Sequence, residues 1–284
     1  MKDIIYEEHN AKLSIERLIR NKEFSMTVKH MHPQYELYYL IAGERYYFIE
    51  SETYHITSGN LVLIDRDEIH KTASSKDPYH ERILVMISGE CIHSIVTMLG
   101  LFSINQLIAT RRIISFPSAI QPDILLLLEQ IATELHFQRK GYETIINLKL
   151  GELLLLAFRC QNYPNPAATI KDISSPKHKK VDEIARFIRE HYNDNLTLSS
   201  LSSLFFIQKE YLSRIFKEVT SVTLTEYIHI QRIKQAKEIL ENSNATITQV
   251  SEAVGYDSIT YFEKSFKKYA GMSPLKYRIT HCTG

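Results

Sequence analysis

Imidazole and carboxylate side chains gather in one short stretch near the N-terminus. Five residues that can hydrogen-bond share even positions there: His30, His32, Gln34, Glu36 and Tyr38. On a continuous β-strand these side chains point to one face, because successive residues alternate between faces. Imidazoles and carboxylates bind first-row divalent metals, and they also hydrogen-bond to polar small molecules. The stretch therefore predicts a polar cluster on one face of a strand, unless Pro33 interrupts the alternation.

A second set of informative residues lies near the C-terminus, where one pattern occurs twice with an offset of 50 residues. The copies run from Tyr211 to Tyr227 and from Tyr261 to Tyr277. A unit this short must bury its apolar face against neighbours. The polar face of the first copy bears Lys209, Glu210, Ser213, Arg214 and Lys217. That of the second copy bears Ser258, Ile259, Thr260, Glu263, Lys264 and Lys267.

The polar faces of the repeat suit a DNA duplex. Arg214 can make a bidentate contact with a guanine edge, worth roughly 1–3 kcal/mol of discrimination. Lys209 and Lys217 are better suited to phosphates. One copy alone would favour a merely solvated helix face, whereas two copies favour a pair of DNA-reading helices.

The N-terminal half must position the polar cluster. Residues 24–87 alternate apolar and polar side chains in short runs, which are broken at Gly43, at 58–60 and at 76–78. This pattern predicts closely spaced antiparallel strands in a sandwich or small barrel. Leu37 and Tyr39 are expected on the face opposite Glu36.

Two amphipathic helices are expected after the strands, because the apolar period changes from about residue 121. The first has its apolar stripe at Ile124, Leu127, Leu128, Ile131 and Leu135, and the second, after Gly141, at Ile145, Leu148, Leu153 and Leu156. This leucine content predicts a helical dimer interface; the alternative is that both helices only cover their own barrel.

The C-terminal half reads as a series of helices. A helix over 181–191 precedes a pair of short helices that begins at Thr197, and a longer helix over 223–240 precedes a second pair that begins at Thr246. We expect Thr197 and Asp257 to cap helices, and Thr246 with Gln249 to form a capping box. Two short helices joined by a tight turn are a helix-turn-helix. The helix between the pairs would hold the two reading helices about 34 Å apart, one turn of DNA.

Composition narrows the class. The chain has 284 residues, of which 44% are hydrophobic and 24% charged, as in ordinary globular proteins of up to two domains. No apolar run approaches the roughly 20 residues that span a bilayer, and the N-terminus lacks a secretory signal, so we expect a cytoplasmic protein with no membrane partner.

The three cysteines have no metal-type spacing and are expected to be free thiols. Lys and Arg number 16 against 12 Asp and Glu from residue 177 onward, and 18 against 21 before it, a modest bias toward a polyanion in the C-terminal half.

The N-terminal half resembles the cupin barrel. The spacing of its first motif is met by His30, His32, Glu36 and Gly43, and the second motif begins at Gly59 and reaches a histidine at His70. In metal-binding cupins the matching positions are the metal ligands. The second motif departs from the family at Asp65, Asp67 and Ser74. Three interpretations stay open: a metal-free effector pocket formed by His30, His32, Glu36, Tyr38 and His70, a structural hydrogen-bonded cluster, and a metal site at His30, His32, Glu36 and His70. We favour the first, with Tyr46, Tyr47 and Phe48 adding an aromatic lining that suits a sugar.

The C-terminal half resembles the DNA-binding domain of the AraC/XylS regulators. The matching residues are Tyr211, Leu212, Ser213, Arg214, Phe216, Lys217, Tyr227, Arg232, Ala236, Gly255, Tyr256, Phe262, Phe266, Lys267, Gly271, Ser273, Pro274, Tyr277 and Arg278. The first motif departs from the family, with Phe206 for the usual turn glycine and Gln208 for the usual capping serine. Phe cannot enter the left-handed region as cheaply as Gly, so this turn must be reshaped or strained.

Together these features predict two domains: an all-β cupin-like barrel followed by two helices at 1–160, a linker at 161–176, and an all-α tandem helix-turn-helix domain at 177–284, with its motifs near 197–218 and 246–269. We expect a transcription regulator, more an activator than a repressor, that binds double-stranded DNA and a small effector such as a carbohydrate. As an activator it would also contact RNA polymerase, and we expect a homodimer. We expect no catalytic residue and no cofactor; the alternative is a metal-dependent cupin enzyme or a metal sensor fused to a DNA-binding domain.

Overall fold

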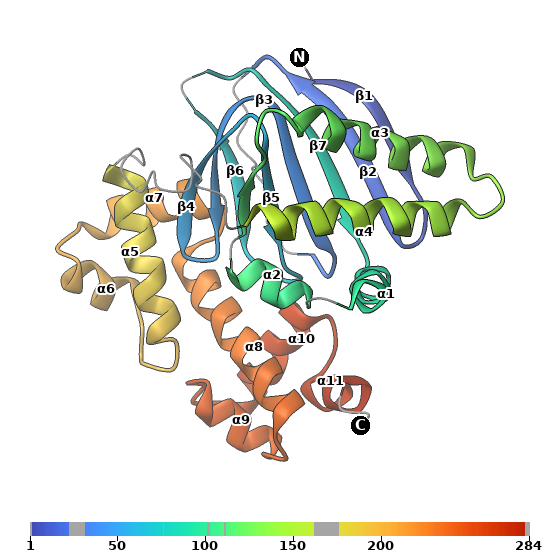
Figure 1. The fold of residues 1–284 in the computed structure, drawn as a ribbon. Coiled ribbons are helices and arrows are strands. Elements are labelled where there is room, and N and C mark those ends of the chain that lie inside the picture. The colour runs from blue at the N-terminus through green and yellow to red at the C-terminus, as the bar shows by residue number, and fades with distance from the viewer. Residues whose placement is uncertain are drawn as a thin grey trace. The chain divides into compact units, whose positions relative to one another are not determined.

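The computed structural model describes residues 2–22, 32–75, 77–100, 103–110, 112–161 and 176–281 (Figure 1). Two compact units divide the chain, Met1–Ser175 and Pro176–Gly284. Most of the expected linker falls on residues 162–175, outside the described residues, so its bounds at 161–176 stay a prediction. No single helix of the described part is long and apolar enough to cross a membrane; one bent pair, Gly89–Leu99 with Ile104–Thr110, passes that test of length and composition jointly.

The N-terminal unit is built on a β-sheet whose strands pair antiparallel throughout. The strands are β1 (Lys2–His9), β2 (Leu13–Arg20), β3 (Tyr35–Ile49), β4 (Glu52–Thr57), β5 (Asn60–Ile64), β6 (His70–Ser74), β7 (His80–Ile87) and β8 (Ile113–Ser115). The order β1-β2-β7-β3-β5-β8 forms the main path, and β4 and β6 pair with the second half of β3. The expected strands from β3 to β7 are confirmed, whereas β1, β2 and β8 lie outside the range we predicted.

Strand β3 changes sheets partway along its length. Its register shifts between Leu40 and Ala42, and Gly43 follows with a φ of 88°. A Cβ at Gly43 would lie 2.3 Å from the carbonyl oxygen of Tyr79, so only glycine fits there. The prediction that Gly43 breaks the strand was wrong: the residue permits a bulge, and the strand continues.

Two cores follow from the two faces of the sheet. Leu37 and Tyr39 join the larger core under the helices, whereas Tyr38 and Leu40 join a smaller core on the opposite, inner face. The alternation predicted around Glu36 is therefore confirmed from the start of β3. The bulge then reverses the parity, because Tyr47 and Ile49 share the inner face with Tyr38.

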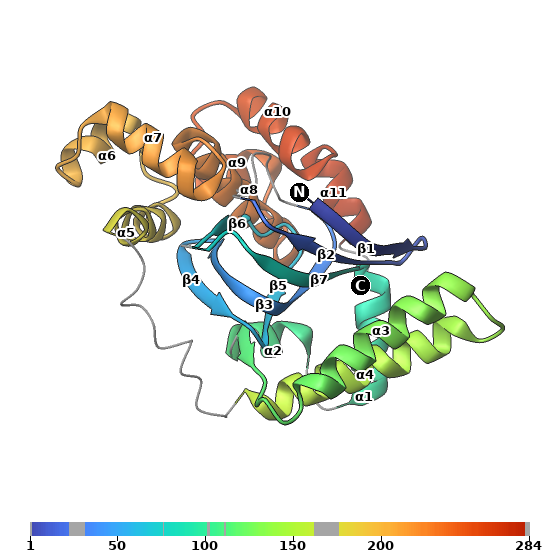
Figure 2. The same cartoon turned by 90° about the horizontal axis from the view of Figure 1, so that it is seen from above.

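Four helices cover the outer face of this sheet, as Figure 2 shows from above. They are α1 (Gly89–Leu99), α2 (Ile104–Thr110), α3 (Gln121–Phe137) and α4 (Tyr142–Cys160). The stripe predicted on α3 is fully buried. On α4 the prediction is confirmed for Leu153 but was wrong for Ile145 and Leu148, which are exposed; Ile146 and Leu150 are buried instead. The sequence did not indicate α1 or α2.

The C-terminal unit is entirely helical over its described residues. Its helices are α5 (Pro176–Glu190), α6 (Leu198–Leu204), α7 (Lys209–Thr220), α8 (Leu224–Asn242), α9 (Ile247–Ala253), α10 (Ile259–Ala270) and α11 (Pro274–His281). Capping boxes start α6 at Thr197, α8 at Thr223 and α9 at Thr246. The expected cap at Asp257 was wrong: Ser258 starts α10, because its extended backbone lets Oγ accept from the Tyr261 amide.

Candidate DNA-binding face and effector site

Helix α7 presents the first predicted reading face. Leu212, Ile215 and Phe216 are buried under it, which fixes its rotation about its axis. The side chains predicted to read DNA are all exposed: Lys209, Glu210, Ser213, Arg214 and Lys217. The guanidinium of Arg214 lies 5.3 Å from the centre of the Tyr211 ring. The aromatic face restrains the long Arg side chain on the exposed side of α7.

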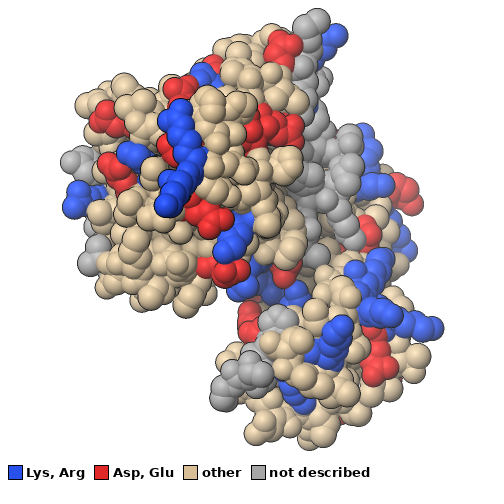
Figure 3. All heavy atoms as spheres, turned by 90° about the vertical axis from the view of Figure 1, so that its right-hand side faces the viewer, with Lys and Arg blue, Asp and Glu red and all other residues tan. Residues whose placement is uncertain are grey.

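Helix α10 presents the second face in the same manner. Phe262 and Phe266 are fully buried beneath it. The predicted residues are again exposed: Ser258, Ile259, Thr260, Glu263, Lys264 and Lys267. Lys and Arg side chains and Asp and Glu side chains both occur on the face in view in Figure 3.

An aromatic cluster that the sequence did not reveal joins α8 to α10. The two ring nitrogens of His229 lie 2.9 Å from the Tyr256 hydroxyl and 3.1 Å from the Tyr261 hydroxyl. Burial, and then the positive charges of Arg232 and Lys268, lower the pKa of His229. A neutral ring can accept one of these hydrogen bonds and donate the other, and it thereby links the N-terminal end of α10 to α8.

The two turns differ as the sequence implied. Phe206 takes a φ of 53° and is 96% exposed, whereas Gly255 takes a φ of 81° in the second turn. Gln208 gives α7 no side-chain cap. Ser202 donates to the carbonyl of Ile207, whereas the buried Oγ of Ser251 has no hydrogen-bond partner among the residues that the structure describes.

We expect the Phe206→Gly variant to be more stable than the natural chain by about 1 kcal/mol. Glycine removes the cost of a left-handed Phe, and the exposed ring forfeits little burial. Urea unfolding of both proteins measures the difference. Ser221→Gly, at the end of α7 where φ is 67°, is a matched comparison and should also gain stability. A loss of stability in both variants would contradict the claim that these positive-φ residues are strained.

The predicted effector residues meet at one end of the inner face of the sheet. Nε2 of His32 lies 3.2 Å from Oε2 of Glu36, and Nε2 of His70 lies 3.3 Å from the same oxygen. His32 precedes β3 and is not part of the strand, so its place in the cluster does not depend on strand parity. His30 lies outside the described residues.

Tyr47 completes this cluster by donating to Oε1 of Glu36 at 2.5 Å. Burial alone would raise the pKa of Glu36, but the charge of His70 and hydrogen bonds from both imidazoles and Tyr47 hold the pKa well below its usual range. Burial lowers the pKa of His70, but the charge and hydrogen bond of Glu36 outweigh it and the net pKa is raised. The cluster therefore holds a carboxylate beside a ring that protonates readily.

The two imidazoles also satisfy the geometry of a metal site. Nδ1 of His32 lies 2.9 Å from the carbonyl oxygen of Gln34, and Nδ1 of His70 lies 2.9 Å from that of Glu68. Donation to a carbonyl leaves each Nε2 able to bind a metal. The three candidate ligand atoms lie within 4.8 Å of one another, as in a two-histidine, one-carboxylate site with open positions. These residues fit a first-row divalent metal.

Tyr38 occupies the inner face as predicted. Its ring packs edge to face against Tyr47 at 5.2 Å, and its buried hydroxyl has no hydrogen-bond partner within the described part of the chain. From the sequence, Tyr47 was expected only in the aromatic lining. The bulge near Gly43 turns Tyr47 toward Glu36, whereas the sequence pattern predicted a strand end at this glycine. A glycine inside an otherwise continuous strand pattern was the available signal.

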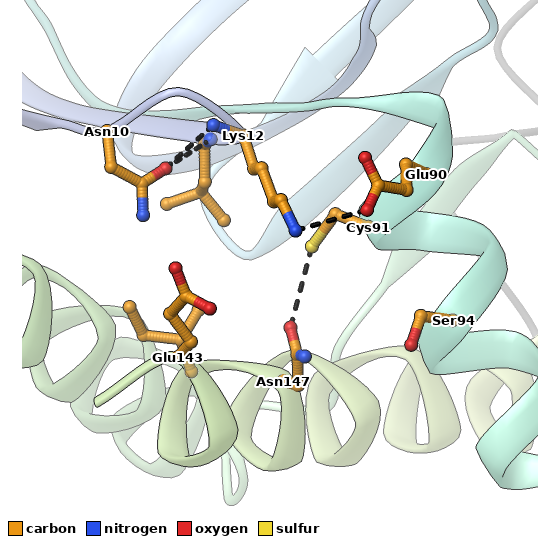
Figure 4. A pocket seen from close by; sticks show the side chains of 9 residues that line it. Asn10, Lys12, Glu90, Cys91, Ser94, Glu143 and Asn147 are labelled. Carbon is orange, nitrogen blue, oxygen red and sulfur yellow. Dashed lines mark hydrogen bonds and ion pairs between the residues drawn. The ribbon is translucent and has the colours of Figure 1, made fainter. Parts of the chain in front are cut away.

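A small surface cavity of about 80 Å³ lies elsewhere in this unit, between the β1–β2 turn, α1 and α4 (Figure 4). Lys12 is paired there with Glu90 at 3.1 Å, and Cys91 donates to Asn147. Pockets that enclose metabolites usually measure roughly 300–1,000 Å³. This cavity is therefore smaller than a pocket that encloses a metabolite.

Helix α8 connects two helix-turn-helix pairs, α6 with α7 and α9 with α10, and a separate β unit precedes them. This arrangement is typical of DNA-binding transcription regulators. The comparisons agree with this class. Residues 201–279 match a family model described as a helix-turn-helix domain, and residues 13–97 match one described as an AraC-like ligand-binding domain. The chain belongs to the AraC family of transcription regulators, with a cupin-like N-terminal unit.

Three relatives are similar over different lengths. The uncharacterized HTH-type transcriptional regulator YisR of Bacillus subtilis is 36% identical over 106 residues, 37% of this chain and 37% of that protein. The Msm operon regulatory protein of Streptococcus mutans is 25% identical over 93% of this chain and 89% of its own length. The melibiose operon regulatory protein of Escherichia coli is 22% identical over 89% of this chain and 84% of its own length.

Proposed function

We propose that this regulator reads a specific DNA sequence with α7 and α10, and that a small metabolite bound on the inner face of the β unit changes its affinity for DNA. The observation that carries the proposal is the repeated arrangement of a buried apolar stripe and an exposed polar face on α7 and α10. Base specificity rests mainly on α7, which offers Arg214, and α10 anchors.

The effector site acts only if the metabolite binds two arrangements of the protein with different affinities. The cluster of His32, Glu36 and His70 supplies donors and acceptors for hydroxyl groups, and Tyr38 and Tyr47 supply aromatic faces. A sugar or a related metabolite fits this lining. A relative named for the melibiose operon supports the same class of effector.

The regulator acts, in this proposal, as a cytoplasmic activator that contacts RNA polymerase. A thermal-shift screen of sugars and related metabolites against the full chain tests the sensing role, because a bound effector raises the melting temperature. The affinity for a DNA sequence that the protein has selected from a random pool is then measured with and without each stabilising compound. We expect a stabilising compound to change DNA affinity by about 5- to 150-fold; a compound that stabilises the chain and leaves DNA affinity unchanged contradicts the sensing role.

We further propose that α3 and α4 form a homodimer interface. They leave several large apolar side chains exposed: Leu126, Phe137, Ile145, Leu148 and Phe158. We expect Leu148→Glu to convert a dimer to a monomer in sedimentation equilibrium at micromolar concentration, because it puts a charge into the apolar contact. Thr97→Glu, at an exposed polar position on α1, is the control. A natural chain that sediments as a monomer contradicts the interface.

A metal-dependent sensor or enzyme is the second candidate, favoured by the convergence of both Nε2 atoms on Glu36. A metal there would act as a Lewis acid or as a link between the effector and the protein. Metal analysis of the purified chain, with and without chelator, decides between the candidates. Stoichiometric iron, manganese or zinc that is lost in His32→Ala supports the metal; a metal content at background in the natural chain leaves the metal-free pocket.

A further inference from the structure

Three arginines lie on neighbouring strands at the other end of the inner face. Arg20 ends β2, Arg82 lies near the start of β7, and Arg45 follows the bulge of β3. The register places Arg82 opposite Leu40 and Leu18, and Arg20 opposite His80. Leu40 belongs to the inner core, so Arg82 faces the same side as Tyr38.

Arg45 is the most unusual of the three, because its side chain is 0% exposed. It donates to Ser74 at 3.0 Å and to Thr72 at 3.2 Å. Burial lowers the pKa of Arg45, and the positive charges of Arg20 and Arg82 lower it further. A buried guanidinium beside two others is costly unless negative charge reaches it.

Two hydrogen-bond donors at this end have no protein partner among the described residues. Arg82 donates through Nη2 to Glu16 at 2.5 Å, but its buried Nη1 has no hydrogen-bond partner. The Tyr38 hydroxyl, on a residue that is 3% exposed, has none either. The Arg82 guanidinium lies 5.7 Å from the centre of the Tyr38 ring, so the two residues with unmet donors are neighbours. A buried donor without an acceptor destabilises the fold, so these two donors indicate a missing acceptor.

His80 lies beside the three arginines and is affected by their charge. It is buried on β7 beside the arginines. Burial, and then the charges of Arg45, Arg82 and Arg20, lower its pKa to about 4. This imidazole therefore stays neutral at physiological pH and adds no charge to the three guanidinium groups beside it.

We infer that Arg20, Arg45, Arg82 and the Tyr38 hydroxyl bind an anionic group, a carboxylate or a phosphate, of the effector. Guanidinium groups pair with these anions through two parallel hydrogen bonds, and the unmet donors at Arg82 and Tyr38 gain acceptors. The Tyr38 and Tyr47 rings lie between this end and the His32, Glu36 and His70 cluster. A sugar acid or sugar phosphate would place its anion on the arginines and its hydroxyls on the imidazoles. The inference rests on the proposed sensing role and narrows its ligand class.

Inorganic phosphate is the simplest probe of the anion site. We expect it to raise the melting temperature of the full chain in a saturable manner above sodium chloride of equal ionic strength. Arg82→Met should weaken the apparent phosphate affinity at least 10-fold. Arg139→Met, at an exposed arginine after α3, should leave it unchanged. Equal phosphate responses in the natural chain and Arg82→Met, or no response above chloride, would overturn the inference.

Tyr38→Phe covers the case in which Arg82→Met fails to fold. It removes only a buried hydroxyl that lacks a partner, so the variant should fold at least as well as the natural chain while binding phosphate several-fold more weakly. Unchanged phosphate binding in Tyr38→Phe counts against the inference.

Glucose and glucose 6-phosphate distinguish a failure of the anion site from a failure of the sensing role. Each is tested for stabilisation of the chain and for an effect on DNA affinity. Stabilisation by the phosphate ester alone supports the anion site. If either compound binds without changing DNA affinity, the sensing role is what loses support. If glucose stabilises the chain and alters DNA binding while phosphate does neither, the sensing role stands and the anion site falls.

Discussion

Gly255→Ala is expected to lower the stability of the C-terminal unit by about 3 kcal/mol. A Cβ at this position would lie 2.4 Å from the carbonyl oxygen of Asn193 and 2.8 Å from its Cα, and the residue has a φ of 81°. Both partners are backbone, so the clash cannot be relieved by a side-chain rotation. Asn193 lies in the loop after α5, which Arg232 of α8 also holds through the carbonyls of Tyr192 and Asp194. We therefore expect weaker DNA binding as well, because this contact helps to set the relation between the two motifs.

Gly271→Ala is the matched control for this prediction. Gly271 also has a positive φ, 78°, but a Cβ there meets no described atom within 4 Å. Gly271→Ala should lower the free energy of unfolding only by the cost of placing alanine in the left-handed region, about 1 kcal/mol. Differential scanning calorimetry of the full chain measures both variants, and the difference should amount to about 10 °C. Equal losses in the two variants would mean that the turn does not pack on Asn193 in solution.

Arg214→Ala is expected to lower the preference for the selected DNA sequence over random DNA by about 10-fold or more. A bidentate contact to a guanine is worth roughly 1–3 kcal/mol of discrimination, and alanine removes it without disturbing the buried side of α7. The change should fall on specific binding, because non-specific binding is dominated by phosphate contacts. Fluorescence anisotropy with the two duplexes at the same salt concentration measures both affinities.

Lys217→Ala on the same helix is the comparison variant. A lost phosphate contact weakens binding to all sequences alike and reduces the slope of log affinity against log salt by about 1. Equal losses on specific and random DNA for Arg214→Ala would contradict its role in reading bases.

The C-terminal fold was predictable because its signals are local and repeated. The buried stripes of α7, α8 and α10 follow the helical period, and three threonines mark helix starts. The one misassigned cap, Asp257, adjoins the true cap, Ser258. The cluster around His229 could not be predicted, because it joins side chains of α8 and α10 that only tertiary packing brings together.

The N-terminal site was predictable only in part. Local alternation was enough for Glu36 and Tyr38, and resemblance was needed for His70. Tyr47 required the bulge near Gly43, and the grouping of Arg20, Arg45 and Arg82 required the register of β2, β3 and β7. Strand pairing is set by contacts distant in the sequence, so a single strand's pattern does not reveal which charges share a face.

The most direct test of the account is a hydroxyl-radical footprint of the full chain on DNA selected from a random pool. Two reading helices on one spacer predict two protected segments on the same face of the duplex, about one helical turn or 10 base pairs apart. Arg214→Ala should blur the sequence preference in one segment and leave the other protected. A single protected segment, or equal loss of both segments in Arg214→Ala, would contradict the division of roles between α7 and α10.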